Sequence, residues 1–379
     1  MNIRRPQPAP LPEPEAVTPP GPVDWRLLTL FMVILSVGLV AILSASDHQS
    51  QRLYGNAYHF FHRQLQAMAM GGVMVLFLCW VPRSFINRLH YWGIGIILVL
   101  LALTLAFGPT INGAKRWINL HFMMLQPMEF ARVALVLYLG YFFSSKQSMV
   151  KTFTRGLLPP IVITLSICLL LMLQPDLGGT IIMLALLFCM CLAGGTKGWY
   201  FMFLLILAAA AVVVLIIVEP YRWARLTAYL EPFANAQGSG YQIVQSLLAL
   251  GSGGIFGVGL GASVQKTRYL PEPHNDFIMA VIGEETGFIG ILSIILLFAI
   301  FLWRCYKVAL GQKNLRDKLT AYGLTIVIAL SFTLSMAVVF GLVPPKGIAM
   351  PFISYGGSSL LSNMICAGLL LHYSRTARE

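Results

Sequence analysis

Apolar stretches of membrane-spanning length recur along nearly the whole sequence. Hydrophobic residues make up 58% of the 379 residues, charged residues only 11%, and the mean hydropathy is +0.77. A water-soluble domain could not bury so much apolar surface in one core. A helix of about 20 residues crosses roughly 30 Å of hydrocarbon, so we predict an all-α integral membrane protein with ten transmembrane helices. The predicted spans are residues 27–46, 63–81, 90–107, 127–143, 157–173, 178–194, 199–218, 277–303, 319–342 and 357–373.

Basic residues are distributed unevenly between the two sides that these spans define. With the N-terminus inside, most of the 26 lysines and arginines fall at cytoplasmic ends of spans, and the densest cluster lies at residues 304–318. Cytoplasmic loops of membrane proteins carry such an excess, so we predict that both termini are cytoplasmic. The basic residues form no continuous stripe, and we therefore expect no DNA or RNA partner.

Two segments differ from the spans in composition. Residues 1–25 are rich in proline and lack apolar periodicity, which predicts a disordered cytoplasmic tail ahead of one polytopic domain at 26–379. The one long connection, 219–275, is predicted outside, between the seventh and eighth helices. Its apolar run 241–250 is half a bilayer long and predicts an interfacial or re-entrant helix. The glycine-rich run 257–261 follows no βαβ pattern, so a close-packed or flexible elbow is favoured over a dinucleotide site.

Three acidic residues, Asp276, Glu284 and Glu285, lie where the chain enters the eighth span. Carboxylates are costly near hydrocarbon, so such a cluster often handles a proton, a cation or a polar substrate. Counting back from Arg304 at about 1.5 Å per residue places the glutamates near the outer boundary and Asp276 at headgroup height. Since about 100° separates successive residues, the three cannot share one face, and at least one glutamate is expected to be structural or supporting. For Asp276, a helix N-cap and a functional role both stay open.

A second group of charges belongs to the fourth span and the loop before it. Glu129 and Arg132 are three residues apart, close enough to form an ion pair that lets a polar turn sit in the membrane. Alternatively, Arg132 and Arg116 bind a phosphate group, for which guanidinium groups are well suited, with Lys115 beside them.

Other candidates lie at the ends of spans. Asp176 either caps the sixth span or belongs to a polar site, and Arg63 either snorkels or binds substrate. The last outer loop is rich in proline and glycine, and its Lys346, Ser354 and Ser358 are candidate ligand donors. Hydroxyl groups that satisfy the loop backbone are an equally good interpretation for the two serines.

Five motifs occur in order at residues 126–130, 174–178, 240–246, 269–278 and 351–359. Together they resemble the SEDS family (shape, elongation, division and sporulation), and the likeness runs from the first span to the last. Lys346 in its Pro-Pro-Lys-Gly string and the run 241–246 resemble the FtsW and SpoVE branches more than the RodA branch. Asn275, Met128, Arg132 and Pro345 depart from the usual family residues without removing a carboxylate or reversing a charge.

The resemblance implies a peptidoglycan glycosyltransferase that polymerises lipid II, the undecaprenyl-pyrophosphate-linked disaccharide-pentapeptide, on the outer face of the bacterial inner membrane. A role at the division septum is expected, with a class B penicillin-binding protein as transpeptidase and other divisome membrane proteins as partners. Asp276 matches the family's essential loop carboxylate and would act as the general base.

The resemblance also implies a substrate-binding set around this base. Glu284 and Glu285 are expected to support it, and a divalent cation, Mg²⁺ or Mn²⁺, at the pyrophosphate stays open. Alternatives are a lipid II flippase, a role in elongation or sporulation, and a non-catalytic scaffold. The expected binding residues are Arg63, Lys115, Arg116, Glu129, Arg132, Asp176, His274, Lys346, Ser354 and Ser358.

Overall fold

The computed structural model is almost entirely helical. It describes residues 21–111, 113–120, 123–200, 202, 206, 229–238, 240–268, 273–345 and 347–376. Residues 1–20 of the predicted tail and nearly all of the predicted seventh span lie outside the described residues.

Each of the other predicted spans coincides with a helix. Among the described residues, six helical segments are long and apolar enough to cross a membrane. The helices at the predicted spans are α1 (Trp25–Tyr54), α2 (His59–Trp80), α3 (Arg83–Phe107), α4 (Pro127–Ser145), α5 (Leu158–Leu173), α6 (Leu177–Gly194), α11 (Ile278–Leu310), α12 (Leu315–Val339) and α13 (Gly357–Ser374).

Short elements complete the described chain. The strands β1 (Ile118–Asn119) and β2 (Met124–Leu125) form an antiparallel pair ahead of α4. A π-helical turn, η1 (Phe153–Leu157), leads into α5. The connection before α11 contains α9 (Tyr241–Gly253) and α10 (Gln265–Arg268).

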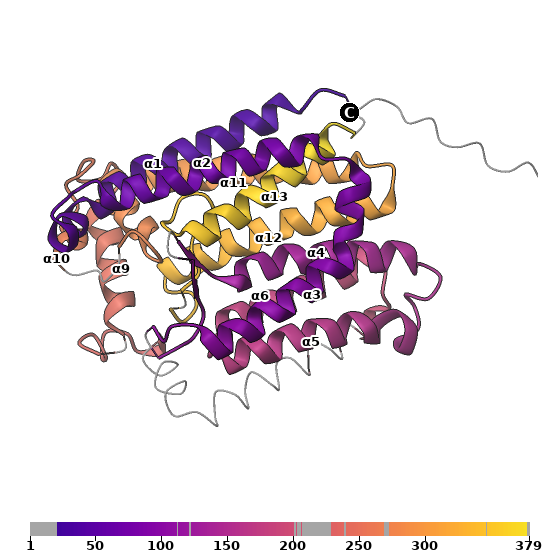
Figure 1. Cartoon of the computed structure of the whole chain (residues 1–379). Helices are drawn as coiled ribbons and strands as arrows, with labels where there is room; N and C mark the ends of the chain where they lie inside the picture. The colour runs from indigo at the N-terminus through magenta and orange to yellow at the C-terminus, as the bar shows by residue number, and fades with distance from the viewer. Residues whose placement is uncertain are drawn as a thin grey trace, which may run out of the picture.

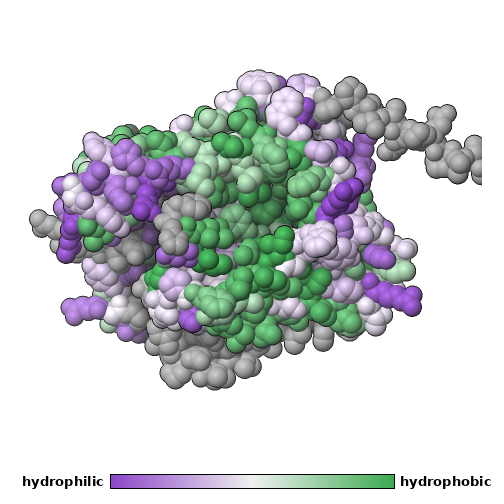
Figure 2. Space-filling view, in the orientation of Figure 1, coloured by the Kyte–Doolittle hydropathy of each residue, from purple (hydrophilic) through white to green (hydrophobic). Residues whose placement is uncertain are grey.

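The long helices lie side by side in a bundle with two distinct ends (Figure 1). At one end, here called the terminal end, the amide of Gly21 donates to the carbonyl of Arg375 at 2.8 Å. The opposite end, here called the loop end, carries α9 and α10. Figure 2 shows hydrophobic residues over the middle of the visible face and hydrophilic residues toward both ends. This distribution is typical of a multi-pass membrane protein.

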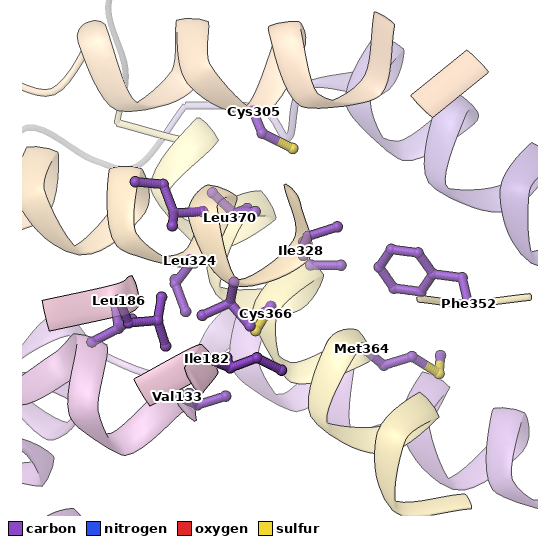
Figure 3. Close-up of a cluster of buried hydrophobic side chains, with 14 of the residues drawn as sticks. Val133, Ile182, Leu186, Cys305, Leu324, Ile328, Phe352, Met364, Cys366 and Leu370 are labelled. Atoms are coloured by element: carbon purple, nitrogen blue, oxygen red, sulfur yellow. The ribbon is translucent and has the colours of Figure 1, made fainter. Parts of the chain in front are cut away.

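The core is built around α4 and α12. Leu135 and Val136 of α4 and Leu324 of α12 are fully buried, and Figure 3 shows side chains from α4, α6, α11, α12 and α13 meeting there. Gly140 and Gly323 lie where α4 and α12 approach each other closely: an added Cβ would lie 2.4 Å from Thr320 Oγ1 and 2.6 Å from Val136 Cγ1, respectively. Small residues at such crossings are typical of helices packed in membranes.

The outer helices expose large apolar side chains instead. Val73 of α2 is 69% exposed and Trp92 of α3 is 74% exposed. In water such surfaces would favour aggregation, but in a bilayer they contact lipid chains. The predicted membrane character therefore agrees with the way the helices are packed.

Helix α11 is interrupted at Gly287, whose φ of 69° and ψ of −166° are not helical. The glycine-rich run after α9 supplies backbone partners there. The amides of Val258 and Gly259 donate to the carbonyls of Glu284 and Glu285 at 2.9 and 3.0 Å, and the amide of Phe288 donates to Gly254 at 2.9 Å. The loop thus replaces hydrogen bonds that the helix loses at its break.

Close approach explains why glycines are needed in this loop. Gly257 has a φ of +81°, and a Cβ at this position would lie 2.1 Å from the carbonyl oxygen of Glu285. The predicted close-packed elbow is confirmed. The predicted helix at 241–250 is also confirmed and extends to Gly253. In Figure 1, α9 runs crosswise to the bundle at the loop end.

Candidate active site

Asp276 lies at the loop end, immediately before the first turn of α11. The N-cap of this helix is Phe277, so Asp276 does not occupy the cap position that the sequence left open. Its side chain is partly exposed and faces Gly347 of the connection between α12 and α13. A Cβ added at Gly347 would lie 3.4 Å from Asp276 Oδ2. The carboxylate thus lies beside a residue without a side chain.

His274 is enclosed between two aromatic rings. Its ring centroid lies 4.3 Å from that of Phe60 on α2 and 5.4 Å from that of Tyr355. Its carbonyl accepts a hydrogen bond from the Tyr355 amide at 2.9 Å. Burial lowers the pKa of the imidazole to about 4, because water cannot solvate the charged form. A neutral, enclosed His274 holds the segment before Asp276 in place and does not attract an anion.

The two candidate serines bind backbone groups. Ser354 donates to the carbonyl of Asn275 at 2.7 Å and accepts from the amide of Met350 at 2.9 Å. Ser358 accepts from the amide of Gln126 at 2.9 Å and donates to the carbonyl of Met124 at 2.8 Å. Both serine hydroxyls therefore satisfy backbone groups, as one of the two interpretations expected. Lys346 lies outside the described residues.

Gln64 is a residue of this region that sequence reasoning missed. It is 2% exposed, its Nε2 donates to the carbonyl of Ser354 at 3.3 Å, and its Oε1 accepts from the amide of Gly356 at 3.4 Å. A polar residue next to Arg63 in a membrane helix was the available signal. Arg63 itself is exposed. Burial raises the pKa of Tyr355, and the nearby Arg63 opposes this rise.

The second group of predicted residues is brought together inside the bundle. Arg132 is 1% exposed, forms an ion pair with Glu129, and donates to Ser331 Oγ at 2.7 Å. Asp176 caps α6 by accepting from the amide of Gly179 at 2.9 Å. It also lies close enough to Arg132 for electrostatic attraction. Both the ion pair and the cap that the sequence offered as alternatives are present.

Of the two basic residues in the loop before α4, Arg116 contacts the turn before Asp176, whereas Lys115 contacts the end of α3. The Nε atom of Arg116 donates to the carbonyl of Gln174 at 3.4 Å, and its guanidinium also binds the carbonyl of Pro175. Lys115 Nζ lies 3.5 Å from the carbonyl of Leu105. A guanidinium has five N–H donors, so Arg116 keeps donors for a ligand while it contacts the turn before Asp176.

The connection before α13 and the first turns of α13 link the surroundings of Asp276 to the buried group around Arg132. Ser354 is bonded to Asn275, the neighbour of Asp276, and Ser358 is bonded to the residues that precede α4. Furthermore, Ser362 Oγ of α13 donates to the carbonyl of Glu129 at 2.6 Å. Residues 354–362 therefore run from the carboxylate at the loop end to the buried ion pair.

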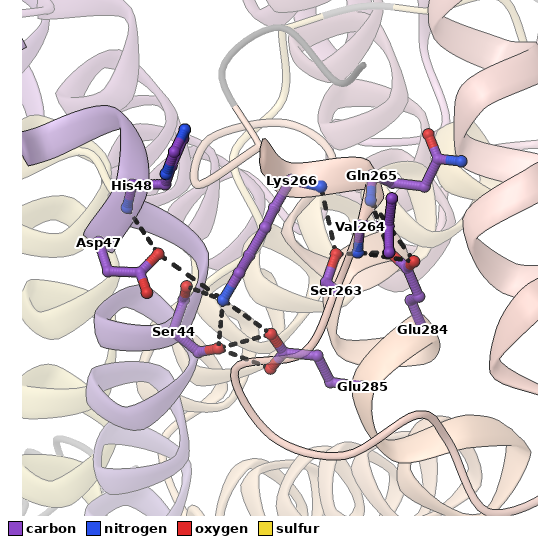
Figure 4. Close-up of polar contacts among 9 residues, drawn as sticks. All are labelled: Ser44, Asp47, His48, Ser263, Val264, Gln265, Lys266, Glu284 and Glu285. Carbon is purple, nitrogen blue, oxygen red and sulfur yellow. Dashed lines mark hydrogen bonds and ion pairs between the residues drawn. The ribbon is translucent and has the colours of Figure 1, made fainter. Parts of the chain in front are cut away.

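Glu284 and Glu285 are both buried and both bonded (Figure 4). Glu284 accepts from Ser263 Oγ at 2.5 Å, and Glu285 accepts from Lys266 Nζ at 3.1 Å. Neither faces an open site, which agrees with the expected supporting role. Lys266 is a second residue that sequence reasoning missed, because its partner is distant in sequence.

An apolar groove of about 610 Å³ runs along the middle of α3, lined by residues from Tyr91 to Leu100. It contains almost no polar surface and none of the predicted site residues. Its lining suits a hydrocarbon chain and no polar headgroup.

Comparison with known proteins gives the family. The family model of the FtsW, RodA and SpoVE proteins, described as cell cycle proteins, matches residues 24–379. The chain belongs to this family. The expected membership in the SEDS family is thereby confirmed.

Relatives in this family align over nearly their full lengths. A probable peptidoglycan glycosyltransferase FtsW of Thioalkalivibrio sp. (strain K90mix) is 44% identical, with 94% of this chain and 90% of the relative covered. Stage V sporulation protein E of Bacillus subtilis (strain 168) is 38% identical, with coverages of 94% and 98%.

Solved structures of the FtsW/RodA/SpoVE family share the fold. A chain of a peptidoglycan synthase complex matches with a TM-score of 0.78 and 28% identity, covering 93% of this chain and 98% of that chain. The rod shape determining protein RodA of Thermus thermophilus matches with a TM-score of 0.71 and 27% identity, with coverages of 97% and 100%.

Proposed function

We propose that this protein is a peptidoglycan glycosyltransferase that polymerises lipid II on the outer face of the cytoplasmic membrane. The observation that carries the proposal is the Asp276 carboxylate, partly exposed at the start of a membrane helix and opposite Gly347. A carboxylate at this height reaches a sugar hydroxyl while the lipid of the substrate stays in the bilayer. Relatives that align over nearly their whole length are named for this activity.

In this mechanism Asp276 acts as the general base. Its carboxylate takes the proton of the acceptor sugar hydroxyl as that oxygen attacks the anomeric carbon of the donor. The new C–O bond forms as the bond to the lipid pyrophosphate breaks, and the pyrophosphate leaves with the electron pair. A single displacement of this kind inverts the configuration at the anomeric carbon.

Two arginines at the loop end are the proposed ligands of the pyrophosphate. Arg63 is exposed near Tyr355, and Arg116 is partly exposed beside the turn at Pro175. Guanidinium groups form strong charge-assisted bonds to phosphate oxygens. The buried group of Glu129, Arg132 and Asp176 forms the polar floor of the site, and Lys115 contributes further positive charge. Lys346, in the same outer loop as Gly347, stays a proposed ligand, while His274, Ser354 and Ser358 hold the loops.

A divalent cation at the pyrophosphate is compatible with one carboxylate. Among the described residues, no group of three or more histidine, cysteine, aspartate or glutamate side chains could hold a metal. Mg²⁺ is commonly held by one or two carboxylates together with substrate phosphates, and Asp276 fits that arrangement. When bound there, the cation would neutralise the charge of the leaving pyrophosphate.

We further propose ten transmembrane helices with both termini in the cytoplasm. The contact between Gly21 and Arg375 at the terminal end supports an even number of spans. The basic cluster at 304–318 falls at the connection between α11 and α12, at that same end, as the positive-inside rule requires. The long connection at 219–275 then lies outside, and α9 lies along the membrane interface.

The proposed partner is a class B penicillin-binding protein, together with other membrane proteins of the divisome. The solved relative is a chain of a complex that coordinates polymerisation with crosslinking, and several relatives are named FtsW. We therefore propose septal synthesis during division. A sporulation or elongation role is the alternative, favoured by the similarity to stage V sporulation protein E.

A lipid II flippase is the second candidate, and the interruption of α11 at Gly287 is the observation that favours it. Carriers often place substrate at broken membrane helices. In this protein the break is filled by backbone groups of the glycine-rich loop, so it offers fewer free groups to a substrate. A flippase would tolerate the loss of the Asp276 charge better than a polymerase.

The test is polymerisation of lipid II by the purified protein with its transpeptidase partner, with and without chelator. We expect Asp276→Asn to abolish glycan strands while the thermal unfolding midpoint stays unchanged. Glu231→Gln, at an exposed acid in the connection before α9, is the matched control and should polymerise normally. Full polymerisation by Asp276→Asn would refute the assignment.

A further inference from the structure

Lys266 is buried at the loop end, where its ammonium group joins three elements. Its side chain is 1% exposed. The Nζ atom donates to the carbonyl of Ser44 on α1 at 2.7 Å and to Glu285 on α11 at 3.1 Å, and lies 3.6 Å from Asp47 on α1. Figure 4 shows Lys266 reaching from the α10 segment toward these partners. An ammonium has three N–H donors, and three acceptors lie within hydrogen-bond distance: the Ser44 carbonyl, the Ser44 hydroxyl at 3.3 Å, and Glu285.

The neighbouring glutamate holds the same segment from its other side. Glu284 accepts from Ser263 Oγ at 2.5 Å, from the Val264 amide at 3.0 Å and from the Gln265 amide at 3.3 Å. Ser263 Oγ in turn accepts from the Lys266 amide at 3.2 Å. Adjacent carboxylates of α11 therefore bind the start of α10 and the ammonium of Lys266 at once.

These contacts act on a piece of α11 that is separate from the rest of the helix. Glu284 and Glu285 lie about two turns after the helix starts, directly before the break at Gly287. Because the helix is not continuous through Gly287, the rest of α11 does not by itself determine the direction of residues 278–286. Contacts from outside the helix hold it as well: the α10 segment bonds Glu284, the glycine-rich loop bonds the backbone of residues 284 and 285, and Ser44 of α1 bonds Glu285. Lys266 adds a charged contact that joins α10, α1 and Glu285 at one atom.

A buried ion pair is a directional constraint and a poor source of stability. Apolar residues of similar volume often pack as well or better, whereas removing one partner leaves a buried charge that is costly. A lysine that is buried between Ser44, Asp47 and Glu285 therefore sets geometry. The group whose position depends on that geometry is Asp276, at the front of the same piece of helix.

We propose that Lys266 is a positioning residue for Asp276, because it clamps residues 278–286 to α1 and to the α10 segment. The inference rests on the proposed function, since it assigns Lys266 a part in the reaction of Asp276. Lys266 itself touches neither substrate nor the reacting atoms.

The first experiment separates positioning from stability. Lys266→Met removes the ammonium and leaves Glu285 with the Ser44 hydroxyl, at 2.6 Å, as its side-chain partner, whereas Lys266→Met combined with Glu285→Met replaces the whole ion pair by apolar side chains. We expect the double variant to regain the thermal midpoint of the wild type. In both variants kcat for lipid II should fall at least tenfold, with KM changed less than about twofold, because misplacement of a catalytic group by about 1 Å costs up to a hundredfold in rate.

The second experiment tests the clamp by a measurement that does not depend on enzyme activity. Hydrogen exchange of residues 276–286, measured on the full-length protein in nanodiscs, should be at least tenfold faster in Lys266→Met and in the double variant. The matched control is Lys313→Met, at an exposed lysine in the connection between α11 and α12, which should change neither exchange nor kcat.

The outcomes are distinct. Unchanged exchange in Lys266→Met overturns the proposal, and so does a double variant with wild-type kcat, since Lys266 would then matter for stability alone. If wild-type protein fails to polymerise lipid II, the proposed function falls, and the positioning role with it. The exchange data would in that case still report whether Lys266 clamps the helix.

Discussion

Asp276 and Gly347 face each other across the loop end, with Oδ2 of the aspartate 3.4 Å from the place where a side chain on residue 347 would begin. The two residues belong to different connections, one before α11 and one after α12. A side chain at position 347 would therefore lie against the carboxylate of Asp276.

This relationship predicts that bulk at position 347 blocks the reaction. Gly347→Val should lower kcat/KM for lipid II at least tenfold, because its branched side chain occupies the space beside the carboxylate, while Gly347→Ala should have a smaller effect. The measurement is polymerisation rate against lipid II concentration. Gly198→Val is the control, since nothing lies within 4 Å of a Cβ at that position. Equal activity of Gly347→Val and wild type would contradict an approach along this side.

The ion pair of Arg132 and Glu129 predicts an asymmetric effect on stability. Arg132→Met leaves the carboxylate buried without its partner, and we expect the free energy of unfolding to fall by about 3–5 kcal/mol. Replacing both residues, with Arg132→Met and Glu129→Met, should restore most of that loss. Thermal unfolding in detergent measures both. A double variant as unstable as the single one would show that the pair does more than neutralise charge.

The buried His274 predicts a pH dependence of stability. Its pKa is lowered to about 4 in the folded state, whereas the unfolded chain has an ordinary value near 6.5. The unfolded state therefore binds more protons between these values, and stability falls as pH decreases from about 6.5 toward 4. The contribution is at most roughly 3 kcal/mol, at about 1.36 kcal/mol per pKa unit.

A comparison of variants isolates this contribution. His274→Phe keeps an aromatic ring between Phe60 and Tyr355, so its unfolding midpoint should drop less than that of the wild type between pH 7 and pH 5. His62→Phe, at an exposed histidine of α2, should retain the wild-type pH dependence. The same pH dependence in all three proteins would show that His274 does not titrate in this way.

The break in α11 predicts strong sensitivity at Gly287. Its φ is +69°, and an added Cβ would lie 2.4 Å from the amide nitrogen of Gly257. Gly287→Ala should therefore separate the glycine-rich loop from the helix and speed hydrogen exchange of residues 254–259 by tenfold or more. Gly95→Ala on α3 is the comparison, because nothing lies within 4 Å of a Cβ at that position. Unchanged exchange in Gly287→Ala would mean that the break tolerates a side chain.

Much of the architecture was predictable because it follows from local composition. Apart from the seventh span, which lies almost wholly outside the described residues, each predicted span coincides with a helix whose ends differ from the prediction by at most eight residues. Long apolar runs could be located in this way because they have one stable arrangement in hydrocarbon. The helix starting at Tyr241 was likewise predictable from the length of its apolar run, and the close-packed glycines near Gly257 from their residue type. The cap at Asp176 and the pair of Glu129 and Arg132 involve residues near in sequence, so spacing alone indicated them.

The tertiary structure was needed wherever the partner is remote. From the sequence, Ser354 and Ser358 could equally bind a ligand or satisfy the loop backbone. The structure shows that each hydroxyl donates to a backbone carbonyl, that of Asn275 and that of Met124, respectively. Gln64 gave little signal because its partners belong to the last outer loop. The N-cap alternative for Asp276 also depended on where α11 begins, which is set by packing of Phe277 in the core.

The sequence by itself determined that this chain is a helical membrane protein of the SEDS family with an acid at the start of its eighth predicted span, because hydropathy and local motifs are properties of neighbouring residues. Only the tertiary structure decided that Gly347 faces this acid and that Lys266 joins α1 to the front of α11. Those contacts join residues far apart in the chain, so they form only when the bundle closes and brings the connections at the loop end together.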